Sequence, residues 1–406
     1  MRIGVLGLGR AFTLMLPTFV ADPRVKLIAA HDPASLACAK FAEDFGGRVH
    51  ASPEALFADT EVELVYIATP HQMHASHVAL AAAAGKHVLL EKPMAISLDE
   101  CNAMICAMQC AKCHLIVGPS HSFDAPVLKA RSIIESGEVG DVRMITALNF
   151  TDFLYRLRRP EELQTEQGGG VVHSQAAHQL DVVRLLGGGL VTTVRAHTGR
   201  WDAARPTEGA YAAMLSFSDG AFASLTYSGN AHFDSDEWMG WQGELGAKKN
   251  PDDYGVVRRR LATITNADDE ARAKANRNYG GTGYAAPPPP ATHEHFGPVV
   301  VSCERGEHDR KDRGGDSGND RVDETGTHVG AGEHTHVIVE CPALSCRVEE
   351  HGPPPGGGDG LAVAEGTDQQ PHGGDRPQER ERDHHDDHDP ADTVRRGGIG
   401  CGHRHF

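Results

Sequence analysis

The chain lacks several features that would place it in other protein classes. Its 406 residues contain no apolar run long enough to span a membrane, and no basic start followed by an apolar stretch of signal-peptide length. A basic region for nucleic acid is also missing, because the formal net charge is −17. We therefore expect a cytoplasmic protein with a small-molecule ligand and with neither a nucleic-acid nor a membrane partner.

Paired cysteine motifs at zinc-finger spacing are missing as well. Four of the nine cysteines lie between residues 101 and 113, mostly along one predicted helix, and only Cys110-Ala111-Lys112-Cys113 matches half of a zinc or redox motif. A reducing compartment would keep them as thiols. We expect structural thiols, with a metal or redox role as the alternative.

The last quarter of the chain has little with which to build a core. Residues 306–406 contain two leucines and one aromatic residue, and they carry 22 acidic and 11 basic side chains. Such a segment cannot bury enough apolar surface to offset its chain entropy. We expect a low-complexity tail that is either disordered or, as we favour, the translation of a GC-rich gene in the wrong frame.

Residues 1–124 alternate apolar strands with helical segments. The strand at 2–6 is followed by further predicted strands at 25–30, 64–68, 87–90 and 115–118, with helices between them. The chain is long enough for two domains. The sequence thus predicts an α/β fold whose first domain is a Rossmann dinucleotide-binding domain with a doubly wound parallel sheet.

A glycine loop follows the first strand. Gly7 allows a tight turn, and Gly9 lets the backbone approach a pyrophosphate, whose charge the next helix N-terminus stabilises. Phe12 stands where a third small residue is expected. Asp32, at the end of the second strand, is placed to accept the adenine-ribose hydroxyls and to repel a 2′-phosphate. This predicts NAD rather than NADP, with a plain turn role for Asp32 as the alternative.

A lysine follows the fourth predicted strand, in Glu91-Lys92-Pro93. The carboxyl ends of strands are where α/β sheets bind ligands. The glycine loop lies at the same edge of the sheet. The sequence therefore places Lys92 beside a bound dinucleotide.

Residues 125–305 read as a second α/β domain with a mainly antiparallel open sheet. A strand at 144–150 and a hairpin over 211–227, turning at Ser218-Asp219-Gly220, support this. Between them, Gly168-Gly169-Gly170 precedes a predicted helix whose spacing puts three polar side chains on one face. These are Ser174, His178 and Asp181. A lone histidine is more often structural, but its position after a glycine loop, in a chain that also has Lys92, favours a functional role.

Four motifs together resemble the Gfo/Idh/MocA family of oxidoreductases. They are the glycine loop, Ala68-Thr69-Pro70 with His74, Gly85 to Pro93, and Gly168 to Asp181, and the resemblance covers residues 1 to about 305. It implies a bound nicotinamide and a second-domain sheet that forms a homo-oligomer. It also implies that Lys92 and His178 act on a substrate hydroxyl. Many members have an aspartate four residues before that histidine, where this chain has Ser174.

Within the family, the chain is most similar to the phthalate dihydrodiol dehydrogenases of aromatic catabolism. The similarity rests on residues 7–12, 238–246 and 293–298. It implies an NAD-dependent dehydrogenase that oxidises a phthalate cis-dihydrodiol to 4,5-dihydroxyphthalate, with His178 as general base and Lys92 stabilising charge on the oxygen. The alternatives are a sugar or cyclitol dehydrogenase of the same family and a non-catalytic NAD-binding sensor.

The expected site residues fall into two groups. Arginines at 156, 158 and 159 would hold the carboxylates of an aromatic dihydrodiol dicarboxylate, unless they form a solvated basic loop. The substrate group is Arg156, Arg158, Arg159, Ser174 and Asp181. The cofactor group is Gly7, Gly9, Arg10, Ala11, Asp32, Thr69, Pro70, His74, Glu91 and Lys92. We expect no metal at the three-residue histidine repeat of 71, 74 and 77, because hydride transfer needs none.

Overall fold

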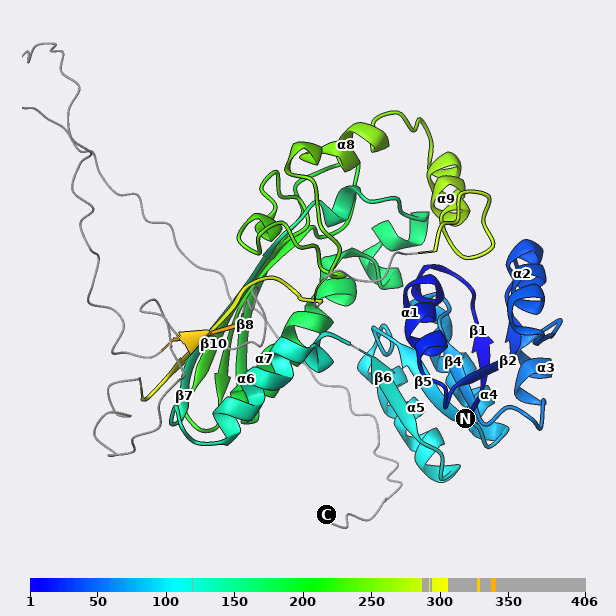
Figure 1. Ribbon diagram of the computed structural model, residues 1–406, viewed down its shortest axis with the longest axis horizontal. Helices are drawn as coiled ribbons and strands as arrows, with labels where there is room; N and C mark the ends of the chain where they lie inside the picture. The colour runs from blue at the N-terminus through cyan, green and yellow to red at the C-terminus, as the bar shows by residue number, and fades with distance from the viewer. Residues whose placement is uncertain (119, 287–291, 293, 306–326, 329–336, 341–406) are drawn as a thin grey trace, which may run out of the picture. The chain divides into compact units, whose positions relative to one another are not determined.

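The computed structural model describes residues 1–118, 120–286, 292, 294–305, 327–328 and 337–340. Its first sheet is entirely parallel, with the order β3-β2-β1-β4-β5-β6 that is typical of dinucleotide-binding domains (Figure 1). The strands are β1 (Arg2–Leu6), β2 (Lys26–His31), β3 (Arg48–Val49), β4 (Leu64–Ile67), β5 (His87–Glu91) and β6 (Leu115–Gly118). The predicted α/β class and parallel sheet are confirmed.

Helices connect these strands and bury the sheet. They are α1 (Arg10–Ala21), α2 (Ser35–Phe45), α3 (Pro53–Phe57), α4 (His74–Ala83) and α5 (Leu98–Cys110). At the start of α5, Ser97 Oγ accepts the backbone N–H of Glu100 at 3.2 Å, as the capping sequence predicts. Glu100 in turn accepts the N–H of Ile96 rather than that of Ser97, so the reciprocal contact is shifted by one residue.

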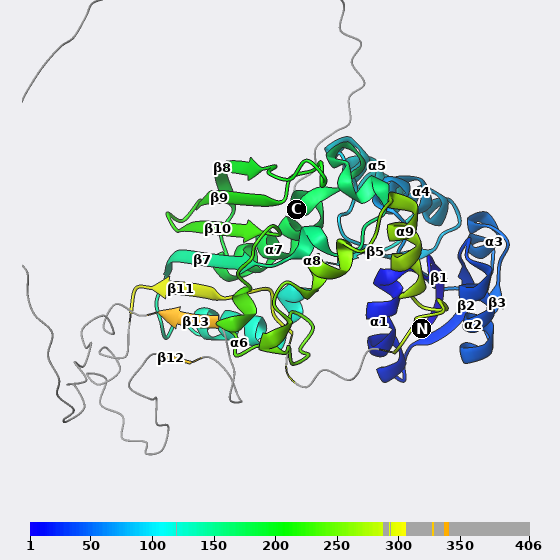
Figure 2. The same ribbon diagram turned by 90° about the horizontal axis from the view of Figure 1, so that it is seen from above.

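The second sheet is mixed and mainly antiparallel, with the order β12-β13-β11-β7-β10-β9-β8 (Figure 2). Among the described strands of this second sheet, only the β7/β10 and β11/β13 pairs are parallel. The strands are β7 (Val142–Phe150), β8 (Val191–Gly199), β9 (Ala210–Phe217), β10 (Phe222–Ser228), β11 (Val299–Cys303), β12 (Thr327–His328) and β13 (Val337–Glu340). The predicted hairpin is present between β9 and β10, with Gly220 at a φ of +92°.

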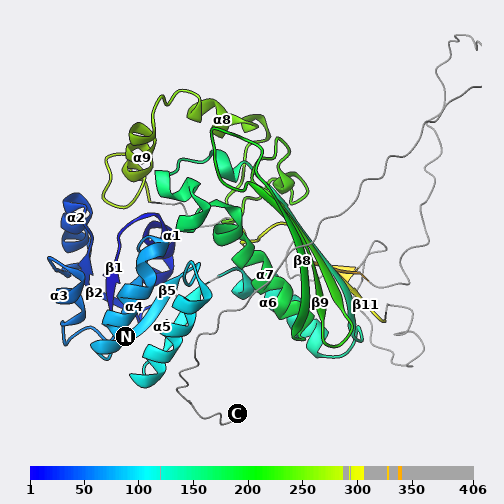
Figure 3. The same cartoon turned by 180° about the vertical axis from the view of Figure 1, so that it is seen from behind.

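Two helices, α6 (Ala125–Glu135) and α7 (Ala177–Gly187), lie along one face of the second sheet (Figures 1 and 3). Their apolar side chains join those of β7, β9 and β10 in one core. Two further helices are α8 (Val256–Leu261) and α9 (Ala267–Asn276). Single-turn helices are η1 (His71–Met73), η2 (His121–Phe123), η3 (Phe153–Tyr155), η4 (Pro160–Leu163), η5 (Thr165–Gln167), η7 (Ser235–Glu237) and η8 (Pro251–Asp253), and η6 (Val172–Ala176) is a π-helix.

The segment after α9 packs onto the first domain. Tyr279 donates its backbone N–H to Thr13 Oγ1 at 2.9 Å and its hydroxyl to Asp44 at 2.6 Å. Its ring meets Phe12 edge-on, with centroids 5.1 Å apart. Phe12 is fully buried, so the residue that replaces the third glycine is accommodated by Tyr279 and by Phe41.

Strands β12 and β13 fall inside the segment 306–406 and extend the second sheet. The rest of that segment lies outside the described residues, so the expected low-complexity tail stays a prediction, as do the boundaries 1–124 and 125–305. None of the helices in the described ranges is both long enough and apolar enough to cross a bilayer.

Candidate active site

The glycine loop has the shape that a dinucleotide requires. Gly7 has a φ of +98°, and a Cβ there would lie 2.7 Å from the carbonyl oxygen of Ala68. A Cβ on Gly9 would meet nothing within 4 Å, so the space above the second glycine is open. The N-terminus of α1 has no side-chain cap, which leaves its N–H groups available to an anion. These residues fit the pyrophosphate of NAD.

Asp32 fixes this loop from the end of β2. Its Oδ2 accepts the N–H of Leu8 at 2.7 Å, and its Oδ1 accepts the N–H of Ala34 at 2.7 Å. The turn role and the ribose role are therefore compatible, because each carboxylate oxygen has a second lone pair. Arg10, beside the loop, has its pKa lowered by burial and then by the positive charges of Arg277 and Arg156.

The turn after β5 is held by His74. This fully buried side chain lies within hydrogen-bond distance of three carbonyl oxygens, Pro93 O (2.9 Å) and Met94 O (3.3 Å) at Nδ1 and Thr69 O (3.0 Å) at Nε2. It thereby ties the end of β4 to the Lys92–Pro93 bond, which is cis. Glu91 accepts the hydroxyl of Tyr66 at 2.6 Å.

Lys92 reaches from this turn to the second domain. Its Nζ donates to the carbonyl oxygen of Ser174 at 2.7 Å. Burial lowers the pKa of Lys92, Arg158 acts in the same direction, and the carboxylates of Glu91 and Glu244 oppose it. The structure thus brings the lysine to the π-helix η6, which directly precedes the helix that carries His178.

The last glycine of the run at 168–170 is required by a buried carboxylate that sequence reasoning missed, whereas a Cβ on Gly169 would overlap the backbone of Glu162. A Cβ on Gly170 would overlap the side chain of Glu208. Glu208 Oε1 accepts the N–H of Val172 at 3.3 Å, and its Oε2 accepts the hydroxyls of Thr165 and Thr207. This contact fixes the first turn of η6, and the signal in the sequence was the glycine run itself.

The expected regular helix around His178 differs in the structure. Residues 172–176 form the π-helix η6, and α7 begins only at Ala177, so Ser174, His178 and Asp181 do not share one α-helical face. Ser174 Oγ donates to the carbonyl of Gly170. Asp181 Oδ1 accepts from Arg184 at 3.2 Å and is not brought to Lys92.

His178 itself is buried, with 8% of its surface exposed. Its pKa is well below the usual value, first because of burial and then because of the positive charges of Lys92 and His121. The imidazole is consequently neutral near pH 7 and able to accept a proton. Its Nδ1 is buried without a hydrogen-bond partner among the described residues.

A second histidine, which the sequence reasoning did not identify, lies against His178. His121 Nδ1 is 2.9 Å from Asp124 Oδ2, and the two imidazole rings are 4.7 Å apart. Within the described ranges, His121, Asp124 and Glu294 form the one group whose spacing would suit a metal, with ligand atoms within 4.8 Å of one another. His121 follows β6, and the carboxyl end of that strand is the signal that could have identified it.

The three expected substrate arginines have different environments. Arg159 pairs with Glu161 at 2.7 Å, and Arg156 contacts Glu244 at 3.4 Å and Asp152 at 3.5 Å. The side chains of Arg156 and Arg159 are 37% and 40% exposed, whereas that of Arg158 is 11% exposed.

Arg158 borders a narrow hollow that is partly open to solvent. The other lining residues are His71, Phe153, Leu154, Glu162, Gly168, Gly169, Gly170 and Ser174. Its guanidinium donates to Phe153 O at 2.5 Å, and its nearest carboxylate oxygen, on Glu162, is 4.0 Å away. Burial lowers the pKa of Arg158 to about 10, so it remains charged at neutral pH.

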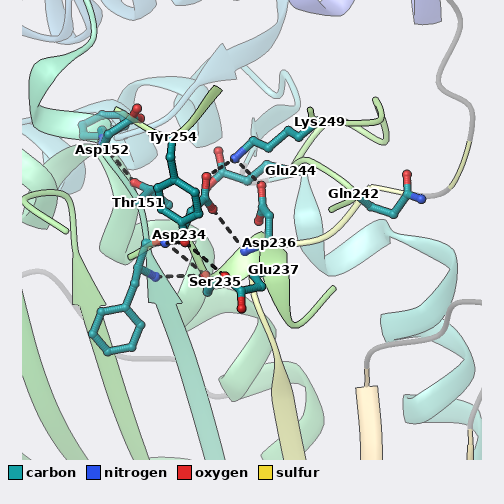
Figure 4. Close-up of polar contacts among 12 residues, drawn as sticks. Thr151, Asp152, Asp234, Ser235, Asp236, Glu237, Gln242, Glu244, Lys249 and Tyr254 are labelled. Atoms are coloured by element: carbon teal, nitrogen blue, oxygen red, sulfur yellow. Dashed lines mark hydrogen bonds and ion pairs between the residues drawn. The ribbon is translucent and has the colours of Figure 1, made fainter. Parts of the chain in front are cut away.

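The loop that carries residues 238–246 supplies Glu244 (Figure 4). Arg156 and then His121 hold the pKa of this carboxyl at about 2 against the effect of burial. Asn149 Nδ2 donates to it at 3.2 Å. Nearby, Lys249 forms ion pairs with Asp234 at 2.6 Å and Asp236 at 2.5 Å, which hold the loop in place.

The remaining histidines of the 71, 74, 77 repeat point to separate partners. His71 Nδ1 lies 3.1 Å from Gly168 O, and His77 Nδ1 lies 3.0 Å from Thr69 Oγ1. The cysteines at 101, 106, 110 and 113 are free thiols.

Two family models match most of the described chain. Residues 1–119 match the model described as "Oxidoreductase family, NAD-binding Rossmann fold", and residues 127–247 match "GFO/IDH/MocA C-terminal domain". The chain belongs to the Gfo/Idh/MocA family. Membership of this family makes it an NAD-binding oxidoreductase, as the glycine loop and Asp32 indicate.

Relatives within the Gfo/Idh/MocA family differ in how much of this chain they share. It is 52% identical over 308 residues to the 1-carboxy-3-chloro-3,4-dihydroxycyclohexa-1,5-diene dehydrogenase of Comamonas testosteroni, covering 75% of this chain and 77% of that protein. It is 30% identical over 204 residues to inositol 2-dehydrogenase 2 of Saccharopolyspora erythraea, covering 49% and 58%. The chain therefore spans little more than half of the inositol enzyme.

Comparison with solved structures also finds proteins of similar fold. A putative dehydrogenase from Bordetella bronchiseptica RB50 superimposes with a TM-score of 0.70 at 41% identity, covering 75% of this chain and 79% of that one. A levoglucosan dehydrogenase in complex with NADH has a TM-score of 0.51 at 24% identity, covering 58% and 68%, and supports the fold alone.

Proposed function

We propose that this chain oxidises a cis-dihydrodiol that carries carboxylates on its ring, with the 4,5-cis-dihydrodiol of phthalate as the specific candidate and 4,5-dihydroxyphthalate as the product. The observation that carries the proposal is the position of Lys92: its Nζ donates to the carbonyl of Ser174, which together with Arg158 lines the hollow, and its charge lowers the pKa of His178. The name of the Comamonas relative, a dehydrogenase of a carboxylated ring diol, supports the substrate class.

The side chains divide the chemistry between them. NAD, when bound, accepts the hydride from the carbinol carbon. His178, neutral and buried, takes the proton as the hydroxyl O–H bond breaks. The ammonium of Lys92, fixed by the carbonyl of Ser174, stabilises the negative charge that develops on the oxygen. The resulting ketone tautomerises to a catechol.

Arg158 is the arginine best placed for a substrate carboxylate. It is largely desolvated and keeps its charge, and its nearest carboxylate is at the edge of ion-pair distance. A guanidinium can bind such a group through two parallel hydrogen bonds. A neutral sugar or cyclitol would offer this guanidinium no carboxylate at close range.

A substrate panel tests the proposal. The protein with NAD is offered phthalate cis-dihydrodiol, a monocarboxylated cis-dihydrodiol, an uncharged cis-dihydrodiol and myo-inositol, and nicotinamide absorbance is followed. We expect the highest kcat/KM for the dicarboxylated diol and the lowest for inositol. Equal or better oxidation of the uncharged diol or of inositol would make the sugar or cyclitol dehydrogenase the better assignment. No turnover with any polyol, together with tight NAD binding, would favour the sensor.

We also propose that the chain forms a homo-oligomer through the second sheet. Strand β8 is exposed at eight of its nine residues. Large apolar side chains of the same sheet are also exposed to solvent: Val194 is 61% exposed and Met214 is 51% exposed. Apolar patches of this kind mark contact surfaces. Light scattering of the wild type and of Val194→Asp tests the assignment, which fails if both are monomers.

A further inference from the structure

We propose that the buried pair of His121 and Asp124 positions the imidazole of His178 for proton abstraction. The inference rests on the proposed role of His178 as the base. Both members of the pair come from the segment after β6, which is remote in sequence from α7. Their proposed role is to hold the ring of His178 in position.

The rings of three residues, His178, His121 and Phe296, pack against one another. The ring centroid of His178 is 4.7 Å from that of His121 and 5.0 Å from that of Phe296, and His121 and Phe296 are 5.1 Å apart. His121 and His178 are 6% and 8% exposed. His178 therefore cannot tilt without displacing His121 or Phe296, because interiors are close-packed.

The side chain of Asp124 does not make the hydrogen bond that is usual at its position in the fold. It is the N-cap residue of α6, where an aspartate normally accepts a backbone N–H of the first turn. Here its side chain makes no cap hydrogen bond and accepts instead from His121 Nδ1. An ionised carboxylate can only accept, so His121 carries its proton on Nδ1 and its orientation is fixed.

The charges around the two histidines give the pair an electrostatic effect as well. His178 faces Lys92 and His121, both of which lower its pKa in addition to burial. His121 faces the carboxylates of Asp124, Glu294 and Glu244, and it also faces His295. The charge of His121 acts against a proton on His178. Loss of His121 should therefore raise the pKa of His178.

No other contact of His178 competes for this role among the described residues. Its Nδ1 is buried and unpaired, and the hydroxyl of Ser174 is taken by Gly170. The contact with His121 and Phe296 is what holds the ring.

The experiment compares Asp124→Asn and His121→Phe with the wild type. The asparagine keeps the shape of the aspartate and removes its charge, and the phenylalanine keeps the ring and removes the hydrogen bond. We expect kcat to fall about tenfold or more in each. For His121→Phe we also expect the acid limb of the kcat/KM profile to move to higher pH, and for both variants NADH affinity, followed by fluorescence, should stay at the wild-type value.

A matched control is available on the far edge of the first sheet. His50 Nε2 lies 3.0 Å from Asp59 Oδ2 in an equivalent histidine–carboxylate pair. His50→Phe should leave both kcat and the pH profile unchanged. A fall in kcat without a shift of the acid limb in His121→Phe would overturn the positioning role, as would wild-type behaviour of both pair variants.

Two further measurements separate this inference from others. If His178→Ala retains turnover, the proposed base is wrong. If His178→Ala is inactive while both pair variants behave like His50→Phe, only the positioning role fails. Activity that is lost on dialysis against EDTA and restored by a divalent cation would show a metal at His121, Asp124 and Glu294, and would also overturn it.

Discussion

Replacing Arg158 by alanine should weaken binding of the substrate's carboxylates and have less effect on the reaction at its diol. The side chain is 11% exposed, and its guanidinium lies 4.0 Å from the nearest carboxylate oxygen, on Glu162. A charged hydrogen bond lost from so desolvated a position costs about 2 kcal/mol, which is about thirtyfold in affinity. We expect KM for a dicarboxylated diol to rise by about that factor, while kcat falls less and NADH affinity is unchanged.

Arg159→Ala is the matched control for this change. Its side chain is 40% exposed and pairs with Glu161 at 2.7 Å, so its removal should alter KM by less than about fivefold. The assay is initial-rate kinetics by nicotinamide absorbance, with thermal unfolding of each variant to confirm folding. Equal effects of the two substitutions would refute the reasoning. An equal rise in KM for an uncharged diol in Arg158→Ala would refute it as well.

Three other predictions concern the cofactor, the catalytic groups and pH. Lys92→Ala and His178→Ala should each lower kcat about a hundredfold or more, with NADH titration showing intact cofactor binding; near-normal turnover in either would contradict the assigned roles. Asp32→Ser should weaken NAD and relatively improve NADP in steady-state kinetics, and a wild type that already prefers NADP would contradict this reading. His71, whose pKa burial lowers to about 4, is protonated at lower pH in the native than in the unfolded state. His71 should therefore contribute a fall of about 1.4 kcal/mol per pH unit to the free energy of unfolding between pH 6.5 and 4. Denaturant unfolding at several pH values should show that this free energy depends less steeply on pH in His71→Asn than in the wild type, and an unchanged pH dependence would be the contrary result.

Much of the first domain follows from its sequence pattern. Strands β1, β4 and β5 lie within one residue of the predicted ranges, because buried parallel strands read as continuous apolar runs. The second sheet was harder to predict. Strand β8 was not predicted at all, since its residues are mostly polar and exposed and show no alternation.

In the candidate active site, the spacing of residues along the sequence does not predict the local structure. The four-residue step from Ser174 to His178 predicts one helical face, but Glu208 and the glycine run impose a π-helix there. Contacts between distant segments leave no periodic signal. The end of β6 marks His121 as a candidate, but no spacing predicts its contact with His178, nor that neighbouring arginines at 156, 158 and 159 have different partners.

The packing of Tyr279 against α1 has a consequence for how such proteins can be recombined. Phe12 fills the position where a smaller residue would let helix and strand approach, and the ring that covers it comes from a segment more than 260 residues later. A nucleotide-binding half transplanted without that segment would expose Phe12 and leave Thr13 and Asp44 without the contacts they make to Tyr279. A chimera joined near residue 124 should therefore keep Tyr279 or another aromatic residue at this position to cover Phe12.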